Sequence, residues 1–429
     1  NRGSISTGYD IDNSLKFEAD NSERIRRNQT TGTNRKKFTV SFWVKRTEIT
    51  STYMVLAIAE ASGNDISFLD FEADDVLRFR DTVSASNQCI LETNRVFRDT
   101  SAWYHIVLRV DTTLSTADDR ARIYVNGVQE TSFSTRTNFD QNDDTFWGYN
   151  GGKLTWGNGL AEANYFSGYV ADAYYIDGQS LAPTEFGEFD EDSGIWKPID
   201  ASGLTFGNNG YYLDFKDASN LGNDASGGTD FTLTNITSAD QSTDTPTNNF
   251  ATLNPLMTNA GSTNYLPITE GGTKAVNTAT AYKIANSTFG VTSGKWYWEV
   301  KATDVNGVTA IGVTMPHYWD TDYTLGGCIY YGQTGQRYNN SSAGSFGATY
   351  TDGDIISFAL DMDATPPTMT VYKNNVSQGN LMSGLSINGA GGAFLPEKKD
   401  FYFPKIVGYN ANTFECNFGG YTSFSISSA

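Results

Sequence analysis

The sequence is poor in cysteine, proline and basic residues. Its 429 residues include 10 prolines and 3 cysteines, and Cys89, Cys328 and Cys416 are too few and too far apart for a disulfide framework or a cysteine metal site. Lys and Arg number 30 against 49 Asp and Glu, which gives a formal net charge of −19 at pH 7. Because so acidic a surface repels phosphate groups, no nucleic acid is expected as a partner, and anionic membranes are poor candidates too.

Long apolar runs and histidines are also scarce. The best apolar run, Met54–Ala59, is far shorter than the roughly 20 residues that span a bilayer, so no membrane insertion is expected. Of the two histidines, His105 is expected to form hydrogen bonds at the edge of a sheet, and His317 has no cysteine or acidic partner at a motif spacing. No Gly-x-Ser-x-Gly or His-Glu-x-x-His motif occurs, and we expect no enzyme activity.

Glycine and aromatic residues are plentiful, with 42 Gly, 24 Tyr and 26 Phe. This composition favours strands and turns over helices. Residues 37–45 alternate in polarity and predict a strand whose apolar face holds Phe38, Val40, Phe42 and Val44. The pair Asn126–Gly127 lies between two β-rich runs and is typical of a tight hairpin turn, because both residue types tolerate positive φ.

The chain is therefore predicted to be all-β, with two tandem antiparallel β-sandwiches joined by an irregular connector. We place the first sandwich at residues 1–199 and the second at residues 266–429. Residues 200–265 change character, with Gly, Asn, Asp, Ser and Thr in long runs, and are predicted to form the connector with at least one strand.

The order of segments within the first 199 residues resembles the laminin-G/concanavalin A-like sandwich family. The residues that carry this resemblance are Ser14–Phe17, Phe38–Arg46, Trp103–His105, Arg122–Gly127 and Phe166–Asp172. The resemblance covers about residues 5–195 and implies a jelly-roll sandwich.

The last part of the chain resembles a SPRY-type sandwich, over about residues 270–422. The matching segments are Gly294–Glu299, Gly353–Ile356, the Lys373–Asn375 hairpin and a terminal Asn417–Gly419. The run Val291–Val300 is expected to pair with Ala310–Val313.

Two such sandwiches in tandem, rich in Gly, Asn, Thr and Tyr and poor in catalytic residues, resemble virion proteins of tailed bacteriophages. The connector from Asn208 to Leu256 adds to this resemblance. It implies a place on the virion surface as a tail or head fibre or a capsid decoration. It also implies other virion proteins as partners and a homo-oligomer.

Two aromatic clusters are candidates for ligand binding. Exposed aromatic rings stack on sugar C–H surfaces and also form hot spots of protein interfaces, so each cluster predicts contact with a host surface glycan or receptor. The alternative is that the rings fill the core, as we expect for Trp43 and Trp103 on their predicted strands. The cluster residues are Trp147, Tyr149 and Trp156 in the first sandwich, and Tyr318, Trp319 and Tyr323 in the second.

A small basic island is a candidate surface for an acidic partner. We expect its two halves to face each other across a turn at residues 28–34, where they could dock a neighbouring subunit by charge complementarity. The alternative is a solvated hairpin. The island consists of Arg24, Arg26, Arg27, Arg35, Lys36 and Lys37.

Calcium is a candidate ligand of one acidic loop. Asp140, Asn142 and Asp144 resemble the start of an EF-hand loop, but Thr145 replaces the required Gly and Gly151 stands where the bidentate Glu belongs. The alternative is a set of exposed turn acids. No other cofactor is expected.

The sequence leaves three functions open. The first is a non-enzymatic virion surface protein that binds host glycans through loops of the sandwiches, and the second is a decoration protein that binds only other virion proteins. The third is a glycan hydrolase. It is disfavoured because the nearest approach to the two-carboxylate glucanase motif, Glu188–Ser193, ends in Ser where the acid/base Glu should stand.

Overall fold

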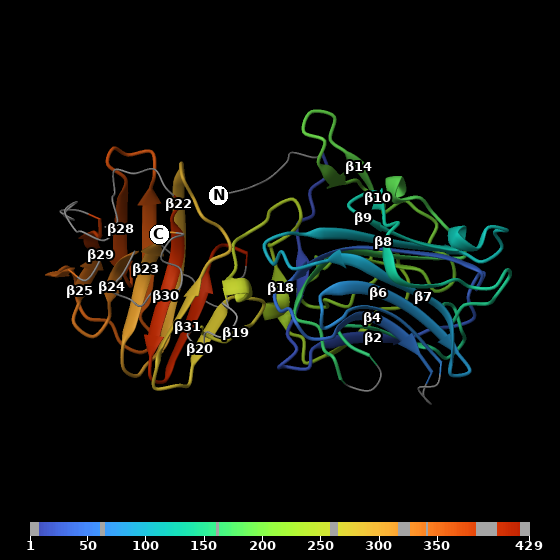
Figure 1. Ribbon diagram of the computed structural model, residues 1–429, viewed down its shortest axis with the longest axis horizontal. Coiled ribbons are helices and arrows are strands. Elements are labelled where there is room, and N and C mark those ends of the chain that lie inside the picture. Colours follow the sequence, from blue (N-terminus) through green and yellow to red (C-terminus); the bar gives the residue numbers. More distant parts are fainter. Residues whose placement is uncertain are drawn as a thin grey trace. The chain divides into compact units, whose positions relative to one another are not determined.

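The computed structural model describes residues 8–60, 65–159, 163–257, 265–315, 327–339, 342–382 and 401–420. The chain forms two compact units, with the boundary between Asn249 and Phe250. Figure 1 shows that both units are built from β-sheets, which confirms the predicted all-β class. Within the described residues the helices are single 3-10 turns, and none is long and apolar enough to cross a membrane: η1 (Ala117–Asp119), η2 (Pro183–Glu185), η3 (Ser238–Asp240) and η4 (Pro255–Met257).

The first unit contains two antiparallel sheets and a projecting hairpin. Sheet 1 has the order β10 (Val128–Gln129), β9 (Ala121–Val125), β8 (Tyr104–Asp111), β3 (Lys37–Arg46), β13 (Gly168–Asp177), β1 (Ser14–Phe17) and β18 (Gln241–Ser242), with β16 (Tyr211–Leu213) also paired to β13. Sheet 2 has the order β11 (Phe133–Thr137), β7 (Ser86–Val96), β6 (Val76–Val83), β5 (Ile66–Phe71), β4 (Tyr53–Ala59), β12 (Lys153–Trp156), β2 (Arg24–Asn28) and β17 (Thr232–Thr234). The hairpin consists of β14 (Gly187–Phe189) and β15 (Trp196–Pro198).

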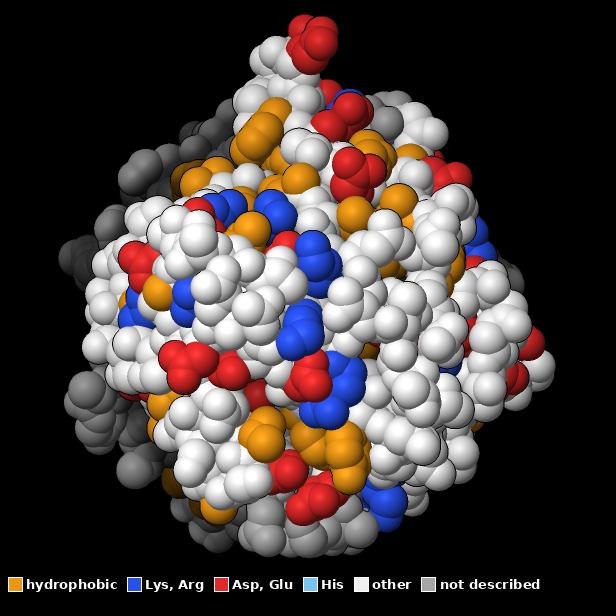
Figure 2. Space-filling view, turned by 90° about the vertical axis from the view of Figure 1, so that its right-hand side faces the viewer, with side chains coloured by type: hydrophobic (Ala, Val, Ile, Leu, Met, Phe, Trp, Pro, Cys, Tyr) orange, Lys and Arg blue, Asp and Glu red, His pale blue; other side chains and the backbone are white. Residues whose placement is uncertain are grey.

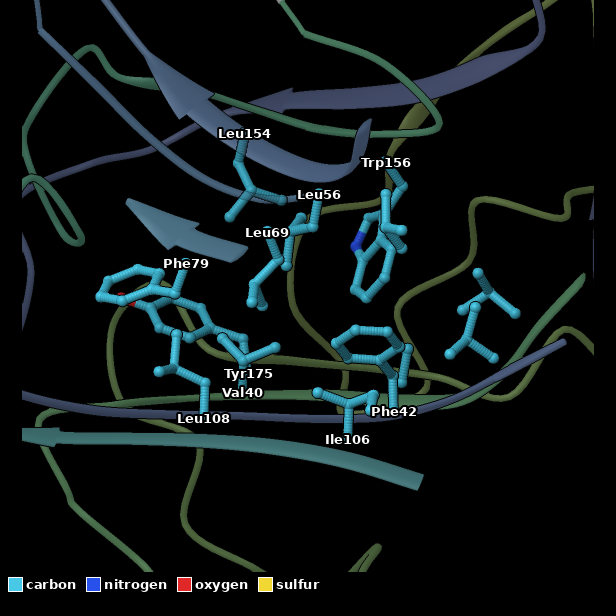
Figure 3. Packing of buried hydrophobic residues seen from close by; sticks show 14 of the residues in the cluster. Val40, Phe42, Leu56, Leu69, Phe79, Ile106, Leu108, Leu154, Trp156 and Tyr175 are labelled. Atoms are coloured by element: carbon cyan, nitrogen blue, oxygen red, sulfur yellow. The ribbon is translucent and has the colours of Figure 1, made fainter. Parts of the chain in front are cut away.

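The main core of this unit lies between the two sheets. As predicted, every second residue of β3 points inward, and the inward set Phe38, Val40, Phe42 and Val44 is at most 1% exposed. Figure 3 shows side chains of β3 and β8 facing those of β4, β5, β6 and β12 across the core. Burial of each such side chain contributes roughly 1.5–3 kcal/mol.

The opposite face of sheet 1 is also covered, unlike that of an open antiparallel sheet. Trp43 and Lys45, on the outward side of β3, are 4% and 0% exposed. A second apolar cluster forms there from Ile11, Trp43, Trp103, Tyr169, Ala171 and Trp196. The N-terminal segment is tied down by the backbone N–H of Ile11, which donates to Thr247 Oγ1 at 3.0 Å.

The segment predicted as a connector differs from the expectation over residues 200–249. It supplies three strands to the first unit, with Tyr212 of β16 opposite Tyr174, Leu233 of β17 opposite Ile25, and Gln241 of β18 opposite Leu15. In the sequence, short strands separated by Asn, Ser and Thr are hard to distinguish from a linker. In the structure, their backbone groups pair with strands of both sheets. The unit therefore extends to Asn249 rather than to residue 199.

The second unit also has two antiparallel sheets. One has the order β19 (Ile268–Thr269), β20 (Lys274–Asn277), β31 (Asn412–Asn417), β22 (Lys295–Val305), β27 (Ile355–Asp361), β28 (Thr368–Lys373) and β29 (Val376–Asn380). The other has the order β21 (Tyr282–Asn286), β30 (Phe403–Tyr409), β23 (Thr309–Thr314), β24 (Gly327–Tyr331), β25 (Gln336–Asn339) and β26 (Ser342–Ser345).

The predicted pairing of Val291–Val300 with Ala310–Val313 is wrong. β22 pairs with β27 and β31, whereas β23 pairs with β24 and β30 in the other sheet. The two strands instead contribute Trp298 and Ile311 to one core from opposite sides. The predicted hairpin at Asn374 and Asn375 is confirmed, because both residues have positive φ between β28 and β29.

Candidate functional site

Three tryptophans border a pocket on the outer face of sheet 1. Trp43 comes from β3, Trp103 precedes β8, and Trp196 begins β15. The pocket has a volume of about 420 Å³. Its remaining walls come from the hairpin β14–β15, from the turn at Asn126 and from residues 246–249. Five segments that are separated in sequence thus build one hollow.

Glycines at two positions make room for the Trp196 indole. A Cβ atom at Gly127 would lie 2.3 Å from Trp196 Cε3, and one at Gly187 would lie 2.6 Å from the same ring. Gly127 also has φ +76°, and Asn126 before it has φ +49°, so the predicted hairpin turn is confirmed. The turn thus has a second role, because the glycine that closes it also receives the indole. In Figure 1 the hairpin strand β14 projects next to β9 and β10.

His105 holds this indole in place. The N–H of Trp196 donates to His105 Nδ1 at 2.9 Å, and His105 Nε2 lies 2.8 Å from Ser41 Oγ. Because an indole N–H only donates, Nδ1 must be the acceptor and Nε2 must carry the imidazole hydrogen. The imidazole also stacks on Trp43, with ring centroids 4.7 Å apart. The prediction of a sheet-edge histidine is wrong, since β8 lies between β9 and β3 and His105 is 1% exposed beneath the hairpin.

We expect the His105 imidazole to make stability depend on pH. Burial lowers the pKa of His105 to about 3, against an ordinary value of 6.5. The unfolded chain therefore binds a proton first as the pH falls below 6.5, and the folded state loses stability, by about 2 kcal/mol between pH 8 and pH 5. Buried carboxyls with raised pKa, such as Asp70 and Asp81, titrate in the same range with the opposite sign, so the measurement is a difference between two proteins. In chemical denaturation from pH 8 to pH 5, the wild type should lose about 2 kcal/mol relative to the variant His105→Asn. The same pH dependence of the unfolding free energy in both proteins would contradict a contribution from His105.

A buried ion pair supports the other side of the pocket. Lys45 Nζ lies 2.7 Å from Asp244 Oδ2, and both side chains are at most 2% exposed. The other carboxylate oxygen of Asp244 accepts a hydrogen bond of 2.9 Å from the indole N–H of Trp103. Lys45 also donates to Asn249 Oδ1 at 2.8 Å, and Asn249 donates to the carbonyl of Ser101. These contacts fix Trp103 and residues 244–249 relative to β3.

The rim of the pocket is apolar and accessible. Phe189 and Ile195, on the two arms of the projecting hairpin, are each 50% exposed. The charged side chain in the lining is Lys197, whose ammonium lies 3.3 Å from carboxylate oxygens of both Glu188 and Asp190. The pocket therefore combines aromatic walls with a compensated charge, which is suited to neutral ligands.

The structure places two of the predicted ligand-binding tryptophans in the core instead. Trp147 and Trp156 are each 1% exposed. Trp147 stacks on Phe38 and donates to Ser67 Oγ, while Trp156 donates to Tyr211 Oη at 3.0 Å. The prediction that these two rings are exposed is wrong, because both face the space between the sheets.

The other predicted aromatic residues have different outcomes. Tyr149 is 37% exposed and lies 5.3 Å below the guanidinium of Arg35, so it remains an accessible ring. Tyr318, Trp319 and Tyr323 lie outside the described residues.

Sequence reasoning missed the pocket tryptophans, although one signal was present. Trp43 occupies the outward, otherwise polar phase of β3, after Thr39 and Ser41 and before Lys45. A large aromatic side chain in that phase indicates that another layer covers the outer face. Much of that layer, namely the hairpin β14–β15 and residues 246–249, comes from segments more than 140 residues away.

The basic island does not form the predicted hairpin. β2 lies in sheet 2 and β3 in sheet 1, so the two halves belong to different layers. Arg27 is 8% exposed and pairs with Asp224 at 2.9 Å, which excludes it from a docking surface.

The other five basic residues also make contacts within the first unit. Figure 2 shows Lys and Arg side chains next to Asp and Glu side chains on the face in view. Docking of an acidic partner by the five stays a prediction. Arg24 contacts Tyr165, Arg26 contacts Thr155, Arg35 contacts the Thr145 carbonyl, Lys36 lies 3.6 Å from Asp144, and Lys37 lies 2.9 Å from Asp111.

Two of the three predicted calcium residues contact a lysine ammonium. Asp144 pairs with Lys36, and the Asn142 carbonyl accepts from the same ammonium. Asp140 is exposed, and its backbone N–H donates to Asp143 at 2.8 Å. In the described part of the chain, no group of three or more His, Cys, Asp or Glu side chains is arranged to hold a metal ion.

The acidic run that approaches the glucanase motif forms the tip of the projecting hairpin. Asp190 Oδ1 accepts hydrogen bonds from the backbone N–H and the hydroxyl of Ser193. These bonds lower the pKa of Asp190 to about 2. The run 188–193 therefore closes a turn, and its Lys197 contacts stabilise the wall of the pocket.

Comparison with protein families identifies the two sandwiches. Residues 17–182 match the family model described as the concanavalin A-like lectin/glucanases superfamily, and residues 295–421 match the SPRY domain. The chain thus carries a laminin-G/concanavalin A-like domain followed by a SPRY domain, as the resemblance implied. No curated protein sequence matches the chain.

Several solved structures are similar to parts of the chain. The SPRY domain of human HERC1 is 19% identical, with 36% of this chain and 92% of that chain covered and a TM-score of 0.29. A heptameric SAP-like pentraxin of Limulus polyphemus is 19% identical, with 41% and 80% covered and a TM-score of 0.31. A candidate carbohydrate-binding protein of Bacteroides ovatus is 15% identical, with 52% and 58% covered and a TM-score of 0.38.

Proposed function

We propose that this chain is a non-enzymatic surface protein of a bacteriophage particle, of the tail or head fibre type, and that it binds host surface glycans through the tryptophan pocket of its first unit. The observation that supports binding is a hollow whose floor contains Trp43, Trp103 and Trp196, each at most 7% exposed, and whose apolar rim is half exposed. The proposed place on a phage particle is supported by the two tandem sandwiches and by a sequence that is rich in Gly, Asn, Thr and Tyr. Many copies on one particle, together with other virion proteins, would raise a weak single-site affinity by avidity.

The polar groups of the pocket are suited to a sugar. Asn126 Oδ1 accepts a 2.8 Å hydrogen bond from the backbone N–H of His105, which fixes the orientation of the amide. Its Nδ2 group therefore points its donors away from that bond, and no described residue accepts from it. A donor beside the exposed Phe189 ring can bind a ring or hydroxyl oxygen while that ring covers C–H groups.

The carboxylates of the first unit support a non-enzymatic role. Burial raises the pKa of Asp70 and Asp81 to about 7 and that of Asp172 to about 6, but all three are at most 2% exposed. Asp70 shares Arg78 with Glu72, which follows β5 directly, so a cation bridges these two acids. A hydrolase instead needs two carboxyl groups that reach the substrate.

Glycan binding should depend on the rim of the pocket. We expect purified, oligomerised protein to bind glycans on an array and to adsorb to host cells, and we expect the variant Phe189→Ser/Ile195→Ser to lose tenfold or more in apparent affinity. Both side chains are half-exposed, so the variant should keep its fold. Val96→Ser is the matched control, because Val96 is 48% exposed on β7 of sheet 2. Absence of binding by the oligomer, or equal binding by the rim variant, would count against the proposal.

A further inference from the structure

We infer that the tryptophan pocket selects neutral sugar units that carry a methyl group, such as a 6-deoxy or an acetamido sugar, over the corresponding plain hexoses. This inference rests on the proposed glycan binding and narrows the class of ligand. Its basis is the chemistry of the side chains that line the pocket.

Within the described residues, the lining contains no carboxylate. The residues with polar or charged side chains are Asn126, Lys197, Thr247 and Asn249. Three of them are already engaged: Lys197 by Glu188 and Asp190, Thr247 by the backbone of Ile11, and Asn249 by Lys45 and Ser101. A ligand face dense in hydroxyl groups would thus be buried with few acceptors for its protons, which is unfavourable.

Apolar surface, by contrast, is abundant at the entrance. Phe189 and Ile195 stand on the hairpin, Pro246 faces them from the returning segment, and Ala102 and Pro198 complete the apolar lining. A methyl group that moves from water to such a surface gains about fourfold in affinity for each buried carbon. Replacing that methyl by a hydroxymethyl group forfeits this gain and leaves a hydroxyl group to satisfy.

The pocket is held in one shape before any ligand arrives. Trp196 lies against Gly127 and Gly187 and is bonded to His105, and Trp103 is bonded to the buried Asp244. Its volume of about 420 Å³ lies within the roughly 300–1,000 Å³ of small-ligand sites. A rigid hollow discriminates between ligands that differ by one group, because its walls do not relax around the wrong one. The Nδ2 donor of Asn126 provides the polar contact, to an acetamido carbonyl or to a ring oxygen.

Matched pairs of sugars test this selection on the full chain. One pair is methyl α-L-fucopyranoside and methyl α-L-galactopyranoside, which differ only at the 6-hydroxyl group. The other pair is the methyl β-glycosides of N-acetylglucosamine and glucose. We expect isothermal titration or ligand-observed NMR to show at least fourfold tighter binding of the methyl-bearing sugar in one or both pairs, and the pair that discriminates identifies the kind of methyl group. In Phe189→Ser/Ile195→Ser the ratio should fall to about one, whereas Val96→Ser should keep it.

The outcomes separate this inference from the proposed function. If both members of each pair bind equally well and the rim variant weakens both, the pocket binds glycans without this selection, and the inference alone is overturned. If none of the four sugars binds and the glycan array is also blank, both are overturned. If the methyl-bearing sugar is preferred but the rim variant keeps the full ratio, another part of the chain makes the selection and the inference fails.

Discussion

Replacing Asp244 by alanine should destabilise the first unit by about 3–5 kcal/mol, because removal of one partner strands the other as an unpaired buried charge. The stranded group would be the Lys45 ammonium, which has 0% side-chain exposure and whose pKa is lowered by burial and raised by Asp244. The same substitution deprives Trp103 of its indole acceptor. We therefore expect Asp244→Ala to lose pocket binding as well as stability. The measurements are chemical denaturation followed by tryptophan fluorescence, and glycan binding below the transition.

An exposed ion pair of the same unit serves as the control. Lys216 and Asp12 lie 3.4 Å apart with side chains 52% and 63% exposed, so Asp12→Ala should change stability by at most about 0.5 kcal/mol. The double variant Lys45→Met/Asp244→Leu removes both charges, and we expect it to recover much of the loss. If Asp244→Ala were as stable as Asp12→Ala, the result would contradict the prediction that the Asp244 carboxylate stabilises the buried Lys45 ammonium.

Gly127→Ala should have the second largest effect. The new methyl group would lie 2.3 Å from the Trp196 ring, and the residue would have to keep φ +76°. Overpacking and the left-handed backbone together should cost roughly 2–5 kcal/mol. We also expect the indole to leave its place beside His105, which would abolish binding at the pocket.

Gly151→Ala separates the two contributions to this effect. Gly151 also has positive φ, at +88°, but a Cβ atom there would meet nothing within 4 Å. That variant should show only the backbone cost, of about 1–2 kcal/mol, and should bind normally. Equal losses of stability in the two variants would show that Trp196 yields to the methyl group without cost.

Local patterns were sufficient to predict the strands and turns. The alternation in β3 and the Asn126–Gly127 turn depend on residues within about ten positions of each other, and the structure has both. The order of such segments was also enough to identify the two sandwich folds. These features are encoded in short stretches, where backbone preference and polarity act together.

The face to which a tryptophan points could not be predicted in the same way. Trp147 and Trp156 have glycine neighbours, which predicts that they lie in loops. Tertiary packing instead buries Trp147 against Phe38 and Trp156 against Tyr211. The alternation of β3 places Trp43 on the outer face, but the layer that covers it there comes largely from distant segments and could not be predicted locally. Pairings across more than 200 residues, such as Leu15 with Gln241, have no local signature.

The pairing of β1 with β18 also bears on how the protein is made. A nascent chain cannot close this edge of sheet 1 until residue 242 has left the ribosome, and the Lys45 ammonium cannot pair with Asp244 until residue 244 has followed. During that interval the outer tryptophan face is open to chaperones and to other unfinished copies. A gene fragment meant to express the first unit alone should accordingly include codon 249. A chain that ends at residue 199 would lack β16, β17 and β18 and could not complete the two sheets.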